Sequence, residues 1–127
     1  MSWRWVSRQA LLLLHAECLA EHGGAAGLRD AGLLDSALVH AQNLAAYGPP
    51  DHAQLAAAYG FGLAKNRAFV DGNQGAAVLA TGLFLALNGY RLKTTQADAT
   101  LTVLALAAGE IDETAFANWI RARSIRR

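Results

Sequence analysis

The sequence predicts an all-α protein, and three observations support this prediction. Alanine and leucine, which favour helices, dominate the composition, whereas there are only two prolines and few β-branched residues. Apolar residues recur at the three- and four-residue spacing of a helix face. Residues that cap helix N-termini stand before these stretches, and glycines follow several of them. We therefore expect about six helices in a single domain spanning residues 1–127.

The first two predicted helices begin at clear capping residues. Ser7 caps a helix that runs to about His22, where Gly23 and Gly24 end it. Asp30 caps a second helix over residues 30–43, before Tyr47-Gly48-Pro49-Pro50 breaks the chain. Helical spacing predicts that the inward faces comprise Leu11, Leu14, Cys18 and Leu19 in the first helix, and Leu33, Leu34, Ala37, Leu38 and Ala41 in the second.

Four further helices follow in the same way. Asp51 caps a third helix through Lys65, and a fourth begins near Asn73 and ends at Asn88-Gly89. Thr95 with Asp98 forms a predicted capping box for the fifth. The sixth is capped by Asp112, buries Phe116, Trp119 and Ile120, and is followed by arginines that we expect to be solvated.

The fourth helix has almost no polar side chain between Ala76 and Leu87, so we place it at the buried centre of the fold. This stretch is too short to span a membrane, and no convincing targeting segment is present. A net charge of +1 does not indicate binding to nucleic acid or to an anionic membrane surface. The lone Cys18 excludes an internal disulfide and fits a reducing compartment, so we expect a cytoplasmic protein without direct nucleic-acid or membrane partners.

The loop before the central helix is the most informative segment. Gly72 and Gly75 flank the helix start, where backbone N–H groups and the helix dipole favour an anion. Asp71 could hold a divalent cation against a bound phosphate, and Phe69 would anchor the loop. The alternative is that Gly72-Asn73 is only a turn with Asn73 as the helix cap. The histidines, which lack metal-ligand spacing, are expected at the surface or at helix ends: His15, His22, His40 and His52.

The segment Phe69-Val70-Asp71-Gly72-Asn73 resembles the signature loop of the Fic/Doc family, and more narrowly that of Doc toxins from toxin–antitoxin modules. The similarity extends over nearly the whole chain, including residues 14–17, 23–24, 28–38, 64–66, 83–89 and 106–112. The resemblance implies six helices around a central one. It also implies transfer of phosphate or AMP from ATP to a protein hydroxyl, with elongation factor Tu as the Doc target and an antitoxin segment as partner.

The resemblance also assigns roles to individual residues. Asp71 would bind Mg²⁺, the backbone of Gly72, Asn73, Gln74 and Gly75 would hold the ATP phosphates, and Asp71, Asn73 and the residue at position 67 would form the catalytic set. Residues 43–52 would correspond to a short flap beside which the target segment docks.

The sequence departs from the family motif at its reactive positions. Arg67 stands where the family has the histidine that accepts the proton of the target hydroxyl, and a guanidinium cannot accept it. Gln74 and Gly75 replace a basic pair that would balance phosphate charge. We therefore expect an impaired enzyme. Two alternatives remain open: a catalytically inactive Fic-fold protein that binds an antitoxin segment or nucleotide, and a purely regulatory module, such as an oligomer that sequesters an antitoxin.

Overall fold

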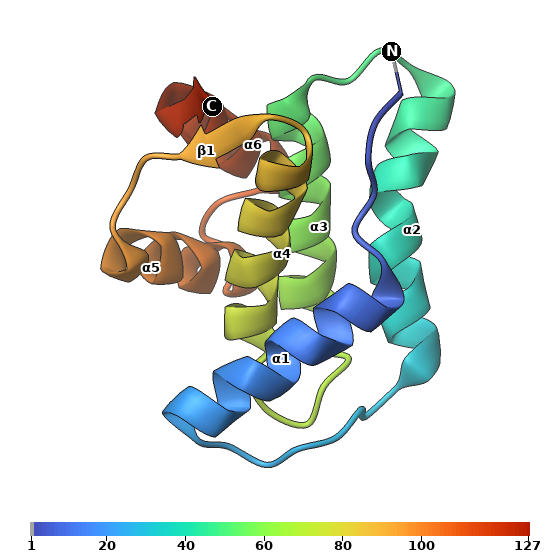
Figure 1. The fold of residues 1–127 in the computed structure, drawn as a ribbon, viewed down its shortest axis with the longest axis vertical. Coiled ribbons are helices and arrows are strands. Elements are labelled where there is room, and N and C mark those ends of the chain that lie inside the picture. Colours follow the sequence, from blue (N-terminus) through green and yellow to red (C-terminus); the bar gives the residue numbers. More distant parts are fainter. Residues whose placement is uncertain (1) are drawn as a thin grey trace.

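The computed structural model describes residues 2–127 and confirms the all-α prediction (Figure 1). The described residues form six helices and two short strands. Their bounds are α1 Arg8–His22, α2 Ala31–Tyr47, α3 His52–Asn66, α4 Asn73–Leu87, β1 Tyr90–Leu92, α5 Gln96–Ala107, α6 Glu113–Arg123 and β2 Ser124–Arg126. None of the helices in this part of the chain is both long and apolar enough to cross a membrane.

Five of the helices begin at the residues that the sequence predicts. In each, the capping side chain accepts a hydrogen bond from a backbone N–H group in the first helical turn, which satisfies a donor that would otherwise lack a partner. Asp51 forms a full capping box with Gln54. The five caps are Ser7, Asp30, Asp51, Thr95 and Asp112.

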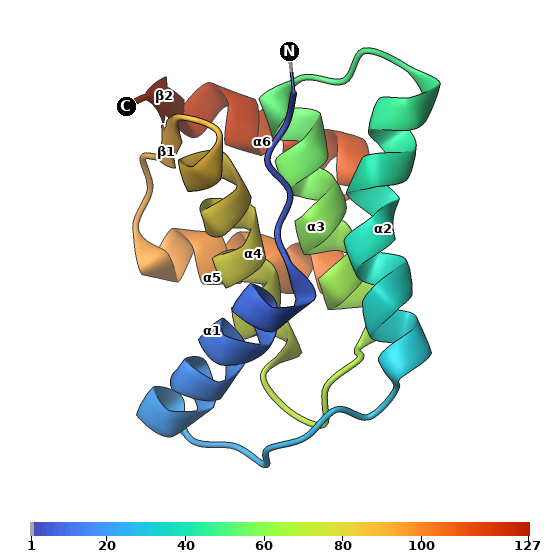
Figure 2. The same ribbon diagram turned by 45° about the vertical axis from the view of Figure 1, so that its right-hand side comes forward.

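The centre of the fold is the pair α3 and α4, which lie side by side with the other helices around them (Figures 1 and 2). The apolar α4 packs between α1, α3 and α5, as its composition predicts, but α3 is buried even more completely. Glycines allow this close packing. A Cβ atom at Gly62 would lie 3.0 Å from the Cα of Ala37 in α2, and one at Gly60 would lie 2.6 Å from the ring of Phe116 in α6.

The segment before α1 crosses the central helices and is part of the core. Trp3 and Trp5 each place their rings about 6 Å from Phe84, at centroid distances of 5.9 and 6.0 Å. The N–H group of Val6 donates to the hydroxyl of Tyr59 at 3.0 Å. These tryptophans therefore pack against the domain in which they occur.

The connection predicted as a flap over residues 43–52 is shorter in the structure. Residues 43–47 complete α2, because Ala45 and Ala46 are strong helix formers, and only residues 48–51 connect α2 to α3. This connection lies at the N-terminal end of α3, whereas the loop with the family motif follows its C-terminal end (Figure 1). Fifteen residues of helix separate the two, which is about 22 Å at 1.5 Å per residue.

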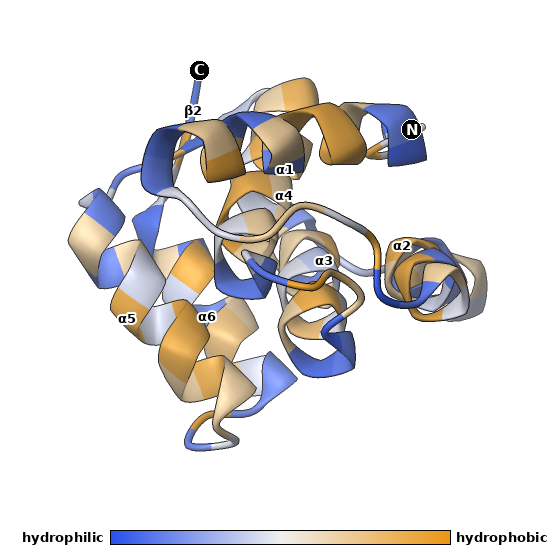
Figure 3. Cartoon of the chain, turned by 90° about the horizontal axis from the view of Figure 1, so that it is seen from below, coloured by the Kyte–Doolittle hydropathy of each residue, from blue (hydrophilic) through white to orange (hydrophobic). Residues whose placement is uncertain are grey.

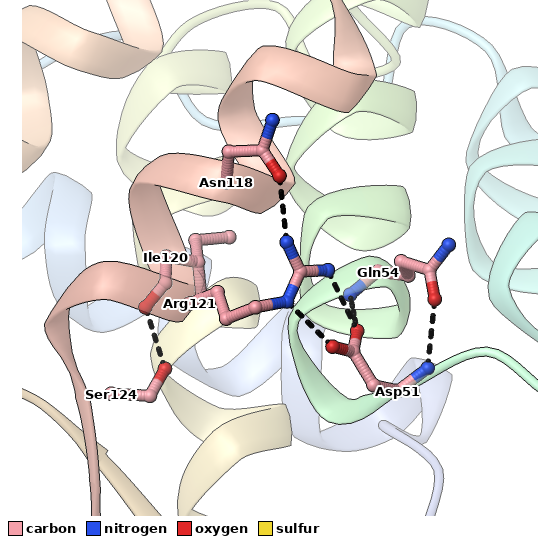
Figure 4. A network of polar contacts seen from close by, with 6 residues as sticks. All are labelled: Asp51, Gln54, Asn118, Ile120, Arg121 and Ser124. Atoms are coloured by element: carbon pink, nitrogen blue, oxygen red, sulfur yellow. Dashed lines mark hydrogen bonds and ion pairs between the residues drawn. The ribbon is translucent and has the colours of Figure 1, made fainter.

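The arginines at the chain end are exposed, as predicted, and several of them also make surface contacts. Arg121 donates two hydrogen bonds to Asp51, at 2.7 and 3.1 Å, and joins α6 to the start of α3 (Figure 4). The antiparallel pairing of β1 with β2, which the sequence pattern does not predict, sets Tyr90 opposite Arg126, and this guanidinium lies 5.3 Å from the Tyr90 ring centre. His52 stacks on the same tyrosine ring at 3.8 Å.

Candidate functional site

The loop that carries the family motif joins α3 to α4 through two left-handed residues. We call residues 67–72 the motif loop. It begins at Arg67, with φ 51° and ψ 52°, and ends at Gly72, with φ 79° and ψ 23°. Arg67 is the one non-glycine residue with positive φ in residues 2–127. Because long side chains rarely adopt this conformation, the neighbouring contacts must hold Arg67 in place.

Asn73 closes the motif loop with its side chain. Its amide accepts a hydrogen bond from the N–H group of Phe69 and donates one to the carbonyl of the same residue, both at 3.0 Å. Asn73 is 4% exposed, so these bonds satisfy backbone groups that water cannot reach. The alternative in which Asn73 caps α4 is therefore wrong. Gly72 occupies the cap position and supplies no side-chain acceptor for the first N–H groups of the helix.

His15 fixes the opposite side of the loop, which corrects the prediction that this histidine lies at the surface or at a helix end. It is 5% exposed and stacks on Phe69 with ring centres 3.7 Å apart. Its Nε2 atom lies 2.7 Å from the carbonyl oxygen of Asp71, so the N–H form donates to that oxygen. Helical spacing with Leu11 and Leu19 on the inward face of α1 was the signal that could have located it.

The segment that lies beside the motif loop is residues 23–30, which joins α1 to α2. Its backbone runs antiparallel to the motif loop, and Leu28 pairs with Phe69. The N–H group of Ala25 donates to Oδ2 of Asp71 at 2.7 Å. Arg29 donates through Nε to the carbonyl of Arg67 at 2.8 Å, which holds the left-handed residue in place. Figure 3 views this end of the molecule, with α1 lying across α4.

Two comparisons of the sequence with known proteins found similarity over the elements that form this site. The Fic/DOC family model matches residues 5–85, which include α1 to α3, the motif loop and most of α4. The chain is also 31% identical over 119 residues to protein kinase doc of Escherichia phage P1, an alignment that covers 93% of this chain and 94% of that protein.

The chain belongs to the Fic/DOC family.

In this Fic/DOC chain a pocket of about 550 Å³ opens at the N-terminus of α4, between α1 and α5. Gly72 and Gly75 line it, as do Cys18 and the carboxylate-bearing Glu17 and Glu21. Four other residues that were expected at the site do not line this pocket: Arg67, Asp71, Asn73 and Gln74. Among the described residues that line the pocket, none is a lysine or arginine, so its charge is acidic.

These residues do not fit a Mg²⁺–polyphosphate. Asp71, the carboxylate expected to bind Mg²⁺, does not line the pocket, and its Oδ2 atom accepts a hydrogen bond from the N–H group of Ala25 at 2.7 Å. A Cβ atom at Gly75 would lie 2.8 Å from Sγ of Cys18, so α1 leaves no room there for a long basic side chain. The acidic lining would repel the phosphates rather than balance their charge.

Proposed function

We propose that this chain is a Doc-like protein of a toxin–antitoxin module that acts by binding a partner segment, with its ancestral transfer of phosphate from ATP to elongation factor Tu impaired or lost. One observation carries the proposal. The motif loop keeps its shape through Asn73, Phe69 and His15, while the reactive positions hold Arg67, Gln74 and Gly75. A site with a maintained scaffold and altered reactive groups is suited to recognition rather than to group transfer.

The expected loss of rate is large. A missing general base costs about 10²–10⁴ in rate, and a missing arginine at a transferring phosphoryl group costs about 10³–10⁵. His15 cannot replace the base, because it is buried and its Nε2 atom is engaged by the carbonyl of Asp71. Each loss alone would slow phosphate transfer by about 100-fold or more.

The binding half of the proposal rests on a groove along α4. The pocket at the motif loop shares Leu14, Val78, Leu79 and Gln96 with a second hollow of about 510 Å³. The second hollow continues along α4 as far as Ala86, with Leu92 and Ala99 on its far wall. We call the two together the α4 groove. Its apolar floor and its length suit an amphipathic segment such as the C-terminal part of an antitoxin.

The deciding experiment is transfer of labelled phosphate from ATP to purified elongation factor Tu. The natural chain is compared with a repaired variant that carries Arg67→His, Gln74→Lys, Gly75→Arg and Cys18→Ala. The last change makes room for the new arginine, and histidine tolerates the left-handed backbone at position 67 better than most residues. We expect label on the target with the repaired variant and none with the natural chain or with the Cys18→Ala control.

A second candidate function, an active transferase, is favoured by the position of His22. This histidine lines the pocket together with Gly72 and is more than half exposed, so it could accept a proton where Arg67 cannot. Label transfer by the natural chain that disappears in a His22→Gln variant would establish this function and contradict our proposal.

A further inference from the structure

The cations of this chain are concentrated in one part of the sequence. Six of the eleven lysines and arginines lie in residues 88–97 and 119–127, which contain no aspartate or glutamate. The rest of the chain carries five cations and all ten carboxylates. The net charge of +1, from which we expected no nucleic-acid partner, therefore conceals a strong asymmetry. The two basic stretches include β1 and β2, which form an antiparallel ribbon beside the end of α6 (Figure 2).

The register of the ribbon shows which of its faces points to solvent. Tyr90 and Leu92 of β1 pack against the core. Side chains alternate along a strand, so Arg91 lies on the opposite face, together with Ile125, its partner in β2. Arg91 and Ile125 are both exposed, which places this face on the outside of the molecule. The outward face is therefore formed by the odd-numbered residues of both strands.

Backbone pairing continues by one residue beyond each end of the two strands. The N–H group of Lys93 donates to the carbonyl of Arg123 at 2.7 Å, and that of Arg127 donates to the carbonyl of Gly89 at 3.0 Å. The alternation of side chains thus adds three cations to the outward face. We call this surface the ribbon face, and its members are Arg91, Lys93, Arg123, Ile125 and Arg127.

Structural roles account for only two of the four cations on the ribbon face. Arg123 and Arg127 each donate to a carbonyl oxygen near the end of a helix, where cations are commonly found. Within residues 2–127, the side chains of Arg91 and Lys93 make no hydrogen bond and no ion pair. Lys93 also stands opposite Arg123, and like charges directly opposite each other destabilise a sheet. An anionic partner would neutralise this charge, which the fold itself leaves unbalanced.

We propose that the ribbon face binds the phosphate backbone of duplex DNA without sequence preference, and that Arg91 and Lys93 are its main contacts. Two strands about 4.8 Å apart fit with their side chains into the major groove of B-form DNA, which is about 12 Å wide. The major groove of an RNA duplex is deep and narrow and does not admit such a ribbon. Lysine and arginine bind DNA by releasing the counterions that surround its phosphates.

The aromatic rings next to the ribbon favour a duplex over a single strand. Proteins that bind single-stranded nucleic acid stack its bases on accessible aromatic side chains. Here Tyr90 is covered by His52, stacked at 3.8 Å, and by the guanidinium of Arg126 at 5.3 Å. Trp119 lies beneath the guanidinium of Arg123 at 4.7 Å. Duplex DNA keeps its bases stacked on one another and needs no such ring.

The ribbon face and the motif loop lie at opposite ends of α4. The motif loop leads into the first residue of this helix, whereas β1 follows its last turn, and the 15 residues between them span about 22 Å. The inference therefore goes beyond the proposed function and does not depend on it. A DNA duplex on the ribbon face and a partner segment near the motif loop can be bound at the same time.

The test is the fluorescence anisotropy of a labelled DNA duplex of arbitrary sequence, about 20 base pairs long, titrated with the natural full chain. We expect a micromolar dissociation constant at low salt. The logarithm of the binding constant should fall with the logarithm of the salt concentration with a slope of about −3. Arg91→Gln/Lys93→Gln should weaken binding by about 10-fold or more and reduce this slope by about 2.

A matched control removes the same charge outside the ribbon. Arg8→Gln/Lys65→Gln has the same net charge as the ribbon variant and changes two exposed side chains on α1 and α3. It should alter the dissociation constant by less than about 2-fold. Circular dichroism checks that both double variants are folded. Equal weakening by the two variants would show that net charge alone governs binding, and it would overturn the assignment to the ribbon face.

Further arms of the experiment test the choice of duplex DNA. Tighter binding of a single strand or of an RNA duplex of the same length overturns this choice. Equally tight binding of polyglutamate, or of vesicles of phosphatidylcholine and phosphatidylserine, also overturns it and identifies an acidic protein or a membrane surface as the partner. Absence of binding at low salt overturns the proposal outright. None of these results bears on phosphate transfer to elongation factor Tu, so the proposed function is tested separately.

Discussion

Asn73 shows how one side chain can hold the shape of a functional loop. The chain turns back between α3 and α4, and this reversal leaves the N–H and carbonyl groups of Phe69 without helix or strand partners. The amide of Asn73 bonds to both groups at 3.0 Å. Since the site is buried, water cannot replace these bonds.

Replacing Asn73 should therefore be costly. Asn73→Ala leaves two buried backbone groups of Phe69 unsatisfied, and we expect the free energy of unfolding to fall by about 3 kcal/mol. Urea unfolding measures this change. The matched control is Asn43→Ala on the exposed side of α2, which should change stability by less than about 0.5 kcal/mol. Equal urea midpoints for the two variants would contradict the role assigned to Asn73.

Two glycines of α4 should respond oppositely to alanine. A Cβ atom at Gly82 meets open space, so Gly82→Ala should stabilise the chain by about 0.5–1 kcal/mol through helix propensity. A Cβ atom at Gly75 would lie 2.8 Å from Sγ of Cys18, and the overpacking should make Gly75→Ala destabilising by about 1 kcal/mol. Thermal unfolding of both variants checks this difference.

A double-mutant cycle identifies the cause of the destabilisation expected for Gly75→Ala. In a Cys18→Ala background the sulfur is absent, so Gly75→Ala should become neutral or stabilising. Persistence of the full destabilisation in this background would show that backbone strain, rather than contact with the sulfur, requires glycine at position 75.

At the residue level, the sequence identified the motif loop but not what supports it. Phe69 was correctly expected to anchor the loop, because its side chain is 2% exposed. The contacts of His15 and Arg29 with the loop join residues that are 56 and 38 positions apart, and neither contact has a local sequence signal. Such contacts depend on how α1 and the 23–30 segment fold back onto the loop, which periodicity alone does not determine.

At the level of elements, helix starts were predictable and short strands were not. Each cap is a local event between a side chain and a backbone N–H group three residues later, so the residue types reveal it. The strands β1 and β2 have three residues each and form only because α6 returns the chain end to Tyr90. The C-terminal end of α2 was also set too early, since no breaking residue precedes Gly48.

The link between α3 and α6 should depend on pH through Asp51. The hydrogen bonds from Arg121 hold the pKa of this carboxyl group below its ordinary 3.8, although partial burial acts in the opposite direction. A lowered carboxyl pKa contributes stability above pH 3.8, and this contribution is lost as the pH falls through the pKa of the folded state. Arg121→Gln should therefore cost up to about 1 kcal/mol at neutral pH and progressively less below pH 3.8.

Urea unfolding of the natural chain and Arg121→Gln from pH 7 to about pH 2.5 tests this dependence. The control is Arg8→Gln, whose single contact with Asp35 is 3.3 Å long and exposed. A stability difference between the natural chain and Arg121→Gln that is the same at every pH would contradict the assignment to Asp51.

On the scale of the whole molecule, the packing of the core indicates that residues 2–127 unfold as a single cooperative unit. Trp3 and Trp5 contact Phe84 in α4, while Trp119 packs on Phe116 in α6. The aromatic probes thus report on both sides of the central helix pair. We expect tryptophan fluorescence and far-ultraviolet circular dichroism to give coincident urea transitions.

A Trp119→Phe variant isolates the fluorescence of Trp3 and Trp5. If this signal changes at lower urea than the helical signal, the segment before α1 unfolds separately, and the single-unit description fails. The same scale explains why the connection between α2 and α3 lies far from the motif loop. Residues 43–52 precede the motif in sequence, but α3 carries the chain to the far end of the molecule before the motif loop begins.

The position of the Cys18 sulfur beside residue 75 also sets the order in which substitutions at these two positions could be accepted. A lineage that acquired histidine at position 67 would need no backbone change, because the left-handed turn there accepts it. A basic residue at position 75 would meet the sulfur of Cys18, so this mutation is deleterious until position 18 becomes smaller. The substitution on α1 must come first. Because of this epistasis, a basic residue at position 75 is accepted only together with a smaller residue at position 18. Close relatives with a basic residue at position 75 should therefore carry glycine or alanine at position 18.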